Sequence, residues 1–339
     1  MTVEPAPAEP AAERAPLLSV RDLHVTYRPA GRGIPAVRGV DIDLAVGETL
    51  GLAGESGCGK TSLAGALLRL LPPGTEVTGE VLLDGEDVLT MKPGRLRAVR
   101  WTHAAIVFQG ALHSLNPVQR VGSQIAEAIR LHSRRMSRAA VSARVGELME
   151  LVGLPARRAR DYPHQLSGGQ RQRVLIGLAL ACDPRLLIAD EPTTALDVMV
   201  QAQVLRLLDD LQESFGVGII FITHDLSTLA DVCRRLAVMY AGRIVEQGPS
   251  HEVFDAPAHP YTRALTGAFP VIGDPAFRMQ PAGLPGDPPD PRELPTGCPF
   301  HPRCPAAVGI CPSTPVELWP AGDDRSAACV HVSGSPVRP

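Results

Sequence analysis

The eight residues from Gly54 to Thr61 have the types and spacing needed to bind phosphate. They read Gly-Glu-Ser-Gly-Cys-Gly-Lys-Thr and fit the pattern GxxxxGK[ST], in which backbone N–H groups surround the phosphates of a nucleotide. Lys60 would contact the β- and γ-phosphates, and Thr61 would bind Mg²⁺. We expect the nucleotide to contact Gly54, Glu55, Ser56, Gly57, Cys58, Gly59, Lys60, Thr61 and Ser62. A chance glycine turn is the alternative, but the loop lies between a predicted strand and a predicted helix.

Two adjacent carboxylates, Asp190 and Glu191, follow an apolar run that predicts a buried strand. Burying two carboxylates is costly unless a cation or a reaction uses them. Asp190 would hold Mg²⁺, and Glu191 would act as the general base that polarises the attacking water. A solvated acidic turn before Pro192 is the alternative. The nearby phosphate loop makes the catalytic interpretation the stronger one.

The segment from Leu166 to Gln170 reads Leu-Ser-Gly-Gly-Gln and begins a run typical of a helix. Ser167 suits the N-cap of that helix. Gly168 and Gly169 leave the backbone bare, so the helix start can approach a γ-phosphate closely. By itself, Ser-Gly-Gly is a common flexible turn. Its place between the phosphate loop and the carboxylates favours nucleotide binding through Ser167, Gly168, Gly169 and Gln170.

Three further residues lie at or near the ends of predicted strands. His224 is placed to contact the γ-phosphate, although a lone histidine is more often structural. Gln109 can bridge Mg²⁺ and the attacking water. Tyr27 can stack on adenine, and an ordinary strand aromatic is an equally good interpretation of the pattern alone.

The apolar runs that would position these residues are typical of a parallel sheet. Continuous runs at 49–53, 186–189 and 218–222 predict strands covered on both faces, and another strand is expected at 104–108. Ligands bind at the carboxyl ends of the strands in such sheets. The phosphate loop, Gln109, the carboxylates and His224 all follow these runs.

Other segments predict the parts around this sheet. Short β-type runs at 17–27 and 36–44 predict an antiparallel subdomain, and a helix is expected at 61–71. Apolar residues recur every three or four positions between 117 and 163, which predicts a helical insertion that ends at the Leu-Ser-Gly-Gly-Gln segment. After about residue 270 the chain becomes rich in proline, so neither a long helix nor a central strand is expected there.

Composition limits the class of protein. The 339 residues suit one ATPase core with an appendage, and no run approaches the roughly 18 apolar residues that span a bilayer. Residues 1–16 lack the pattern of a signal peptide and predict a disordered lead-in, so a cytoplasmic location is expected. The net charge of −3 gives no reason to expect nucleic-acid binding.

The order of these motifs resembles the nucleotide-binding subunits of ABC transporters over residues 17–250. The matching positions are Tyr27, Gly54 to Thr61, Gln109, Leu166 to Gln170, Asp190-Glu191, Ala195-Leu196-Asp197 and His224. More narrowly, the chain resembles the ATPases of dipeptide and oligopeptide (peptide/nickel) importers. The segments that carry this closer resemblance are 162–165, 189–197, 259–262, 297–300 and 303–305.

The resemblance implies an α/β fold, a P-loop NTPase core of the ABC type with an antiparallel β subdomain and a helical insertion. It implies an ATPase domain at 17–270, with its helical subdomain at about 117–165, and a Pro/Cys-rich C-terminal extension at 271–339. It also implies ATP and Mg²⁺ as cofactors, and nucleotide contact by Asp197. The implied catalytic residues are Glu191, His224, Gln109 and Lys60, and the implied Mg²⁺ ligands are Thr61, Gln109 and Asp190.

The same resemblance implies an ATP-hydrolysing subunit on the cytoplasmic side of the cell membrane. Its expected partners are a second ABC ATPase, as a heterodimer with a paralogue, two transmembrane permease subunits and an extracytoplasmic substrate-binding protein. The permeases would contact the surface near Gln109 and 114–124. Peptides are the expected solute and nickel the alternative. ATPases of DNA repair or of ribosome-acting factors share the signature, but they usually have a longer insertion or two ATPase units.

Four of the seven cysteines lie in the proline-rich tail, at Cys298, Cys304, Cys311 and Cys329. A disulfide is not expected in a reducing cytosol. Four thiolates suit a [4Fe–4S] cluster, which the resemblance also implies. Zinc is the alternative, with His301 and His331 as further ligands. Cys182 and Cys233 are expected on helices as buried core thiols.

Overall fold

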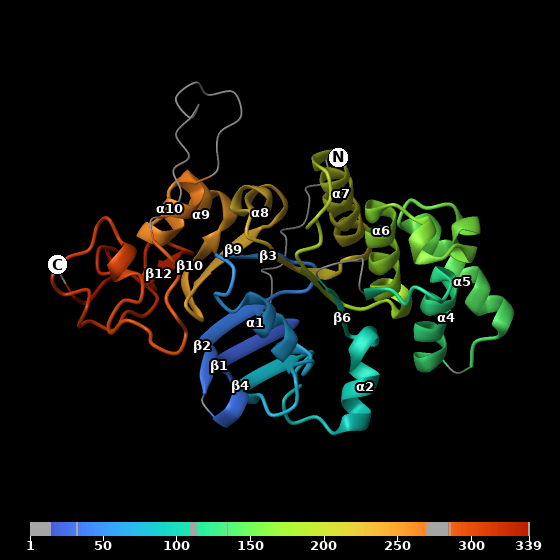
Figure 1. Ribbon diagram of the computed structural model, residues 1–339, viewed down its shortest axis with the longest axis horizontal. Helices are drawn as coiled ribbons and strands as arrows, with labels where there is room; N and C mark the ends of the chain where they lie inside the picture. Colours follow the sequence, from blue (N-terminus) through green and yellow to red (C-terminus); the bar gives the residue numbers. More distant parts are fainter. Residues whose placement is uncertain are drawn as a thin grey trace, which may run out of the picture.

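The computed structural model describes residues 15–337 except 32, 109–113, 134, 269–283 and 285. Within this part the chain forms two sheets with helices around them (Figure 1). The smaller sheet is antiparallel and has the strand order β2-β1-β4-β5. Its strands are β1 (Leu18–Tyr27), β2 (Ile34–Leu44), β4 (Glu76–Leu83) and β5 (Glu86–Asp87).

The larger sheet has the strand order β11-β12-β10-β9-β3-β8-β7-β6. The five strands from β9 to β6 are parallel, and β10, β11 and β12 extend the sheet in antiparallel fashion. Its strands are β3 (Thr49–Ala53), β6 (Ala104–Val107), β7 (Leu186–Asp190), β8 (Gly218–Ile222), β9 (Arg235–Tyr240), β10 (Arg243–Pro249), β11 (Trp319–Pro320) and β12 (Ser326–Ala327). Every residue of β3, β7 and β8 is buried, as their continuous apolar sequences predict.

The helices have the following bounds: α1 (Lys60–Leu67), α2 (Pro93–Thr102), α4 (Val121–His132), α5 (Arg138–Leu151), α6 (Gly168–Ala179), α7 (Val198–Phe215), α8 (Leu226–Val232), α9 (Ser250–Asp255) and α10 (Pro260–Gly267). In Figure 1, α4 and α5 lie at one end of the molecule and α6 lies between them and the sheet. The helical insertion and the antiparallel subdomain are therefore confirmed, and the domain boundaries stay a prediction.

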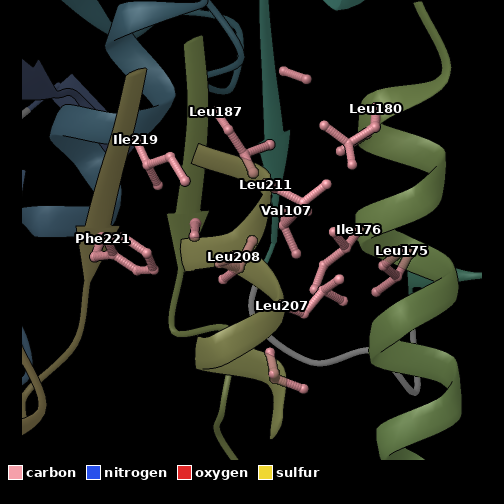
Figure 2. Packing of buried hydrophobic residues seen from close by; sticks show 14 of the residues in the cluster. Val107, Leu175, Ile176, Leu180, Leu187, Leu207, Leu208, Leu211, Ile219 and Phe221 are labelled. Carbon is pink, nitrogen blue, oxygen red and sulfur yellow. The ribbon is translucent and has the colours of Figure 1, made fainter. Parts of the chain in front are cut away.

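Helix α6 is joined to the sheet by a core of aliphatic side chains. In Figure 2, Leu175 and Ile176 of α6 point toward Val107 of β6 and Leu207 of α7. All four side chains are buried and belong to one cluster that continues through β7 and β8. Burial of each such side chain stabilises the fold by about 1.5–3 kcal/mol. The packing fixes α6 to the strand ends that carry the carboxylates.

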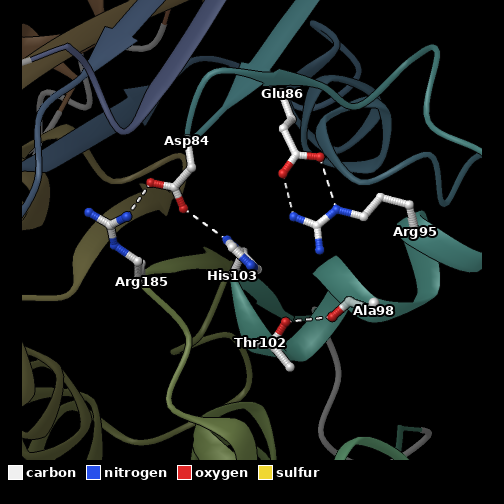
Figure 3. A network of polar contacts seen from close by, with 7 residues as sticks. All are labelled: Asp84, Glu86, Arg95, Ala98, Thr102, His103 and Arg185. Atoms are coloured by element: carbon white, nitrogen blue, oxygen red, sulfur yellow. Dashed lines mark hydrogen bonds and ion pairs between the residues drawn. The ribbon is translucent and has the colours of Figure 1, made fainter.

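A polar network joins the antiparallel sheet to the parallel one (Figure 3). Asp84, which follows β4, accepts a hydrogen bond from His103 Nδ1 (2.9 Å) and pairs with Arg185. His103 precedes β6, and its carbonyl accepts the backbone N–H of Arg185 just before β7 (3.0 Å). Asp84 therefore connects the two subdomains where β6 and β7 begin.

The structure differs from three expectations about local structure: the length of one helix is wrong, and the two for Cys182 and Cys233 are met only in part. The helix expected at 61–71 ends at Leu67, because Arg69 has a left-handed φ of 51° and Leu70 bonds back to the Gly65 carbonyl. Cys182 ends a short 3-10 helix, Leu180–Cys182, and is only half-buried. Cys233 is a buried thiol, but it follows α8 as its C-cap.

The described part of the C-terminal segment packs against the core more closely than its proline content suggested. The sequence predicted neither a long helix nor a central strand in this proline-rich segment, and its described residues from 284 to 337 nevertheless contribute buried apolar side chains. Phe300, Val316 and Val330 are buried, and β12 pairs with β10 at the edge of the larger sheet. The ion pair between Arg325 and Glu246 is also buried, with side chains 8% and 0% exposed. Residues 1–14, expected to be disordered, lie outside the described residues.

Candidate nucleotide-binding site

The phosphate loop connects β3 to α1 as the sequence predicts. Gly59 is the N-cap of α1 with a left-handed φ of 112°, and no side chain caps the helix. The first N–H groups of α1 are therefore available to a ligand, at the positive end of the helix dipole. A Cβ atom on Gly59 would lie 2.2 Å from the Ala36 carbonyl oxygen, so only glycine fits.

Lys60 is buried inside this loop, with 6% of its surface exposed. Its Nζ donates to the carbonyl oxygens of Gly54 (2.6 Å) and Glu55 (3.0 Å) and lies 3.6 Å from Cys58 Sγ. Burial is the main reason that the pKa of the Cys58 thiol is raised. The ammonium group is thus held within the loop that would surround the phosphates.

Asp190 and Thr61 meet beside the loop. The Thr61 hydroxyl donates to Asp190 Oδ1 at 3.5 Å, and Asp190 is 1% exposed. Asp190 Oδ2 is buried and has no hydrogen-bond partner among the described residues. Burial raises the pKa of this carboxyl group. An unpartnered buried carboxylate oxygen next to a threonine hydroxyl fits the hard oxygen ligands that Mg²⁺ prefers.

Glu191 follows β7 with a left-handed φ of 47°. Its Oε2 accepts a hydrogen bond from the Thr194 hydroxyl (2.7 Å), and His224 Nδ1 lies 3.7 Å from its Oε1. Its backbone N–H donates to the carbonyl oxygen of Ile222 in β8 (2.8 Å), which fixes the strand end. The structure therefore brings Glu191 and His224 together at the edge where Asp190 and the loop lie.

The remaining predicted residues are placed less directly. The Tyr27 hydroxyl donates to Ser62 Oγ (3.0 Å), so this half-buried ring lies beside α1. Asp197 is the N-cap of α7 and accepts from the Val200 N–H (3.1 Å). Gln109 lies outside the described residues. The nucleotide contacts expected of Tyr27, Asp197 and Gln109 stay predictions.

The Leu-Ser-Gly-Gly-Gln segment forms the start of α6. Ser167 Oγ accepts from the Gln170 N–H (3.3 Å), and Gln170 Oε1 accepts from the Ser167 N–H (3.1 Å), which is a complete capping box. Within the described ranges, no hydrogen bond joins this segment to residues 54–62. Figure 1 shows α6 and α1 on different parts of the molecule.

Sequence reasoning missed two contacts to the phosphate loop. Tyr261 of α10 accepts a hydrogen bond from the Glu55 N–H (2.8 Å), and Arg303 of the C-terminal segment pairs with the Glu55 carboxylate (2.7 Å). Both residues lie in segments that carry the resemblance to peptide importers. No local pattern predicts a contact across 248 residues of sequence, however.

The four tail cysteines are free thiols that lie near one another. The Cys311 sulfur accepts the Val308 N–H at 3.4 Å, and the backbone N–H groups of Phe300, Ala306 and His331 lie near the sulfurs of Cys298, Cys304 and Cys329 respectively. Burial, followed by smaller effects that include the neighbouring thiols, raises the pKa of Cys298 to about 11. In the described part of the chain, no group of three or more His, Cys, Asp or Glu side chains has metal-binding geometry.

The alternative zinc ligands are also engaged. His301 Nδ1 donates to the Cys298 carbonyl (2.9 Å), and His331 Nε2 donates to the Ala306 carbonyl (2.8 Å). N–H bonds to cysteine sulfur are typical surroundings of metal-bound thiolates. The donor chemistry fits a cluster, although the side-chain geometry described is not that of an assembled site.

The fold and these strand ends define an ABC-type ATPase, and comparisons with known proteins agree. A family model described as "ABC transporter" matches residues 37–194, and one described as "Oligopeptide/dipeptide transporter, C-terminal region" matches residues 245–311. A solved structure titled as dimeric MJ0796, a bacterial ABC transporter cassette, is similar with a TM-score of 0.62 and 28% identity. It covers 69% of this chain and 98% of that one.

Curated relatives extend the match to almost the whole chain. The probable peptide ABC transporter ATP-binding protein y4tR of Sinorhizobium fredii is 46% identical over 92% of this chain and 94% of its own length. The oligopeptide transport ATP-binding protein OppD of Escherichia coli is 44% identical over 92% of each. The chain belongs to the family of ATP-binding subunits of oligopeptide and dipeptide ABC transporters. It is an ATPase, as the sequence predicted.

Proposed function

We propose that this chain hydrolyses ATP to energise peptide import through a membrane ABC transporter. The main support is the grouping of five side chains at the carboxyl ends of β3, β7 and β8. They are Lys60, Thr61, Asp190, Glu191 and His224. This geometry supports ATP hydrolysis, and the names of the relatives support peptide transport as the process that it energises.

Each residue has a chemical task in this proposal. Lys60 and the first N–H groups of α1 hold the phosphates, and Thr61 with Asp190 holds Mg²⁺. The metal neutralises phosphate charge when it is bound. Glu191 accepts the proton of the attacking water, and Thr194 orients its carboxylate. His224 lies on the other carboxylate oxygen, where it can contact the γ-phosphate.

Two variants test the site. Glu191→Gln should retain ATP binding and reduce turnover at least about 100-fold, because the amide cannot accept the proton of water. Lys60→Ala should weaken ATP binding itself. The measurement is the ATPase rate of the assembled transporter beside equilibrium ATP binding to the isolated chain. Equal rates for wild type and Glu191→Gln would contradict the assignment.

A second ATPase subunit, a paralogue in a heterodimer, would complete the site. The start of α6 makes no described hydrogen bond to its own phosphate loop, so Ser167, Gly168 and Gly169 are placed to serve the loop of a partner. The similar cassette MJ0796 is described as dimeric. The isolated chain should then hydrolyse ATP slowly, and the paralogue should raise its rate. Full activity of a monomer would contradict the proposal.

The membrane partners would be two permease subunits, with an extracytoplasmic peptide-binding protein beyond them. In the described residues no helix is long and apolar enough to cross a bilayer. A hollow of about 250 Å³ lies between β6 and α6, lined by Trp101, Phe108 and Leu175 among others. Phe108 is 44% exposed, so an apolar cytoplasmic segment of a permease could dock in the hollow and bury this ring.

A permease segment bound in this hollow would shift α6. The N-terminal end of α6, which would contact the partner's ATP, would shift with it. Phe108→Asp should leave the ATPase rate of the isolated chain unchanged and abolish stimulation by the permeases. Uptake assays in a deletion strain, with peptides and nickel as alternative solutes, identify what is carried. The chain would thus lie on the cytoplasmic side of the membrane as a peripheral subunit.

We also infer a [4Fe–4S] cluster at the four tail cysteines. Support comes from the four sulfurs, which lie near one another with a backbone N–H near each. Anaerobically purified protein should be brown and contain about four irons per chain. Colourless protein with one zinc per chain would replace the cluster with zinc and leave the ATPase site unaffected.

A further inference from the structure

Glu55 of the phosphate loop is held by an arginine from the C-terminal segment. Arg303 Nη1 donates to Glu55 Oε2 at 2.7 Å, and Arg303 Nη2 donates to Glu55 Oε1 at 2.9 Å. Two parallel charged hydrogen bonds fix direction as well as distance. The two side chains are 7% and 21% exposed, so solvent screens this pair much less than a surface ion pair. The hydrogen bonds to Glu55 raise the pKa of Arg303.

An aromatic cluster holds Arg303 in place. Its guanidinium carbon lies 5.9 Å from the ring centres of both Tyr240 and Phe300, and Nη1 also approaches the Tyr240 hydroxyl (3.4 Å). Tyr240, Tyr261 and Phe300 pack with ring centres 4.6–5.3 Å apart, and all three are buried. Because these rings are fixed, the arginine has little freedom to leave Glu55.

The same cluster also holds the backbone of Glu55. Its N–H donates to the Tyr261 hydroxyl (2.8 Å), and its carbonyl oxygen accepts from Lys60 Nζ (3.0 Å). Glu55 is therefore fixed through both its side chain and its main chain, and it contacts the lysine that would hold the phosphates. A shift of Arg303 would be transmitted to Lys60 through a single residue.

On its other side, Arg303 adjoins the cysteines. It precedes Cys304 directly, and the backbone N–H of Phe300, whose ring lies against Arg303, is near the Cys298 sulfur. Arg303 ends the short 3-10 helix His301–Arg303, which lies between these two cysteines. Arg303 thus lies on a short helix within the seven residues from Cys298 to Cys304, so a rearrangement at these thiols has a direct route to it.

We propose that Arg303 is a positioning residue for the phosphate loop, through which the cysteine segment and bound ATP affect each other. The proposal rests on the proposed nucleotide site. Loss of the Arg303 contact should weaken ATP binding, and ATP binding should alter how readily the cysteines react. Linkage requires both effects, since a coupling between two sites is reciprocal.

The test uses the full chain and two measurements. Equilibrium binding gives the Kd for MgATP. Mass spectrometry after iodoacetamide labelling of the full chain, freed of iron and zinc by a chelator, gives the reaction rates of Cys298 and Cys304 with and without MgATP. Arg303→Gln should raise the Kd about fivefold or more and remove the effect of MgATP on labelling. Arg303→Lys keeps the charge but loses the paired geometry, so it should give a smaller change of the same sign.

Two matched arginines serve as controls. Arg292→Gln removes an exposed ion pair with Asp290 in the same segment and should change neither measurement. Arg325→Gln breaks the other buried ion pair of the segment, with Glu246, and should lower thermal stability while the Kd stays near wild type.

Three outcomes would overturn the proposal or its basis. A wild-type Kd in both Arg303→Gln and Arg303→Lys, beside a weakened Lys60→Ala, rejects the positioning role and leaves the nucleotide site standing. Equal weakening by Arg303→Gln and Arg325→Gln assigns the effect to general loosening and rejects the coupling. A wild-type Kd for Lys60→Ala rejects the nucleotide site itself.

Discussion

The starts of α1 and α6 are both glycine-containing helix N-termini, yet they are built differently. No side chain caps α1, whose N-cap Gly59 has a φ of 112° and no room for a Cβ atom. Helix α6 has a complete capping box between Ser167 and Gln170. A Cβ atom on Gly168 would meet only Leu196 Cδ2, at the ordinary contact distance of 3.4 Å.

This difference shows that glycine is present at the two helix starts for two different reasons. At Gly59 the fold itself excludes a side chain, because the loop passes close to the Ala36 carbonyl. At Gly168 the fold leaves room, so its glycine is better explained by an approach from outside the chain. Gly169 is an intermediate case, since its Cβ atom would lie 2.3 Å from Val200 Cγ1 of α7. Glycine at 59 is thus explained by contacts within the chain, whereas glycine at 168 is consistent with the proposed composite site, in which α6 would serve a partner's loop.

Gly59→Ala should give the largest effect. The left-handed φ is unfavourable for alanine, and its Cβ atom would lie 2.2 Å from the Ala36 carbonyl oxygen. We therefore expect the variant either to lose at least about 3 kcal/mol of stability or to lose all measurable ATP binding. The matched Gly168→Ala should fold with wild-type stability. Thermal unfolding and ATP binding of the two variants provide the measurement. A destabilised Gly168→Ala would remove the distinction between the two helix starts.

Gly168→Asp tests the outward role of α6. A carboxylate at this helix start would repel the γ-phosphate of a partner's ATP, so turnover of the assembled transporter should fall about 100-fold. ATP binding to the isolated chain should stay near wild type, because the altered residue does not serve its own loop. Weakened binding in the isolated chain would show that α6 acts on the same subunit's nucleotide.

Acid should destabilise the chain through His259, which caps α10, the helix whose Tyr261 contacts the phosphate loop. His259 caps α10 by accepting the Tyr261 N–H (3.0 Å), and complete burial lowers the pKa of His259 to about 4 from 6.5. The unfolded chain therefore binds the proton first as the pH falls below 6.5. Stability should drop by about 2 kcal/mol from about pH 7 to about pH 5.

Chemical denaturation at several pH values measures this loss. His259→Asn keeps a cap acceptor without a titrating ring, so its stability should depend less on pH over the same window. The matched variant His251→Asn, at an exposed position of α9, should keep the wild-type dependence. An unchanged slope in His259→Asn would assign the acid sensitivity to other groups.

Much of the fold could be predicted because its signals are local. The runs at 49–53, 186–189 and 218–222 have enough apolar residues to specify buried strands, and the 3.6-residue period specified α4 and α5. The end of α1 was not predictable, because Leu67 and Leu71 are equally apolar and the left-handed Arg69 makes the difference. The buried packing of the tail was missed because it depends on partners such as Tyr240 that lie far away in sequence.

The nucleotide site shows the same division. The positions of Asp190 and Glu191 at the end of β7, and of Lys60 at the start of α1, could be predicted because a charge after an apolar run and a glycine loop before a helix are local patterns. The Glu55–Arg303 pair could not, since a glutamate in a glycine loop and an arginine before a cysteine have no shared local signal. The pair exists only in the tertiary structure, where Tyr240 and Phe300 hold Arg303 beside Glu55.

The smallest predicted effect distinguishes two roles of Ser167 at the start of α6, as a helix cap and as a contact to ATP. Ser167→Ala removes the oxygen that accepts the Gln170 N–H, so stability should fall by about 1 kcal/mol. Ser137 makes the same kind of cap on α5, where it accepts the Ala140 N–H at 3.1 Å, and Ser137→Ala should cost a similar amount. Unfolding in denaturant measures both losses. Only Ser167→Ala should also slow ATP turnover of the assembled transporter, because α5 contributes nothing to the proposed composite site. Equal turnover in the two variants would mean that Ser167 is needed only as a helix cap.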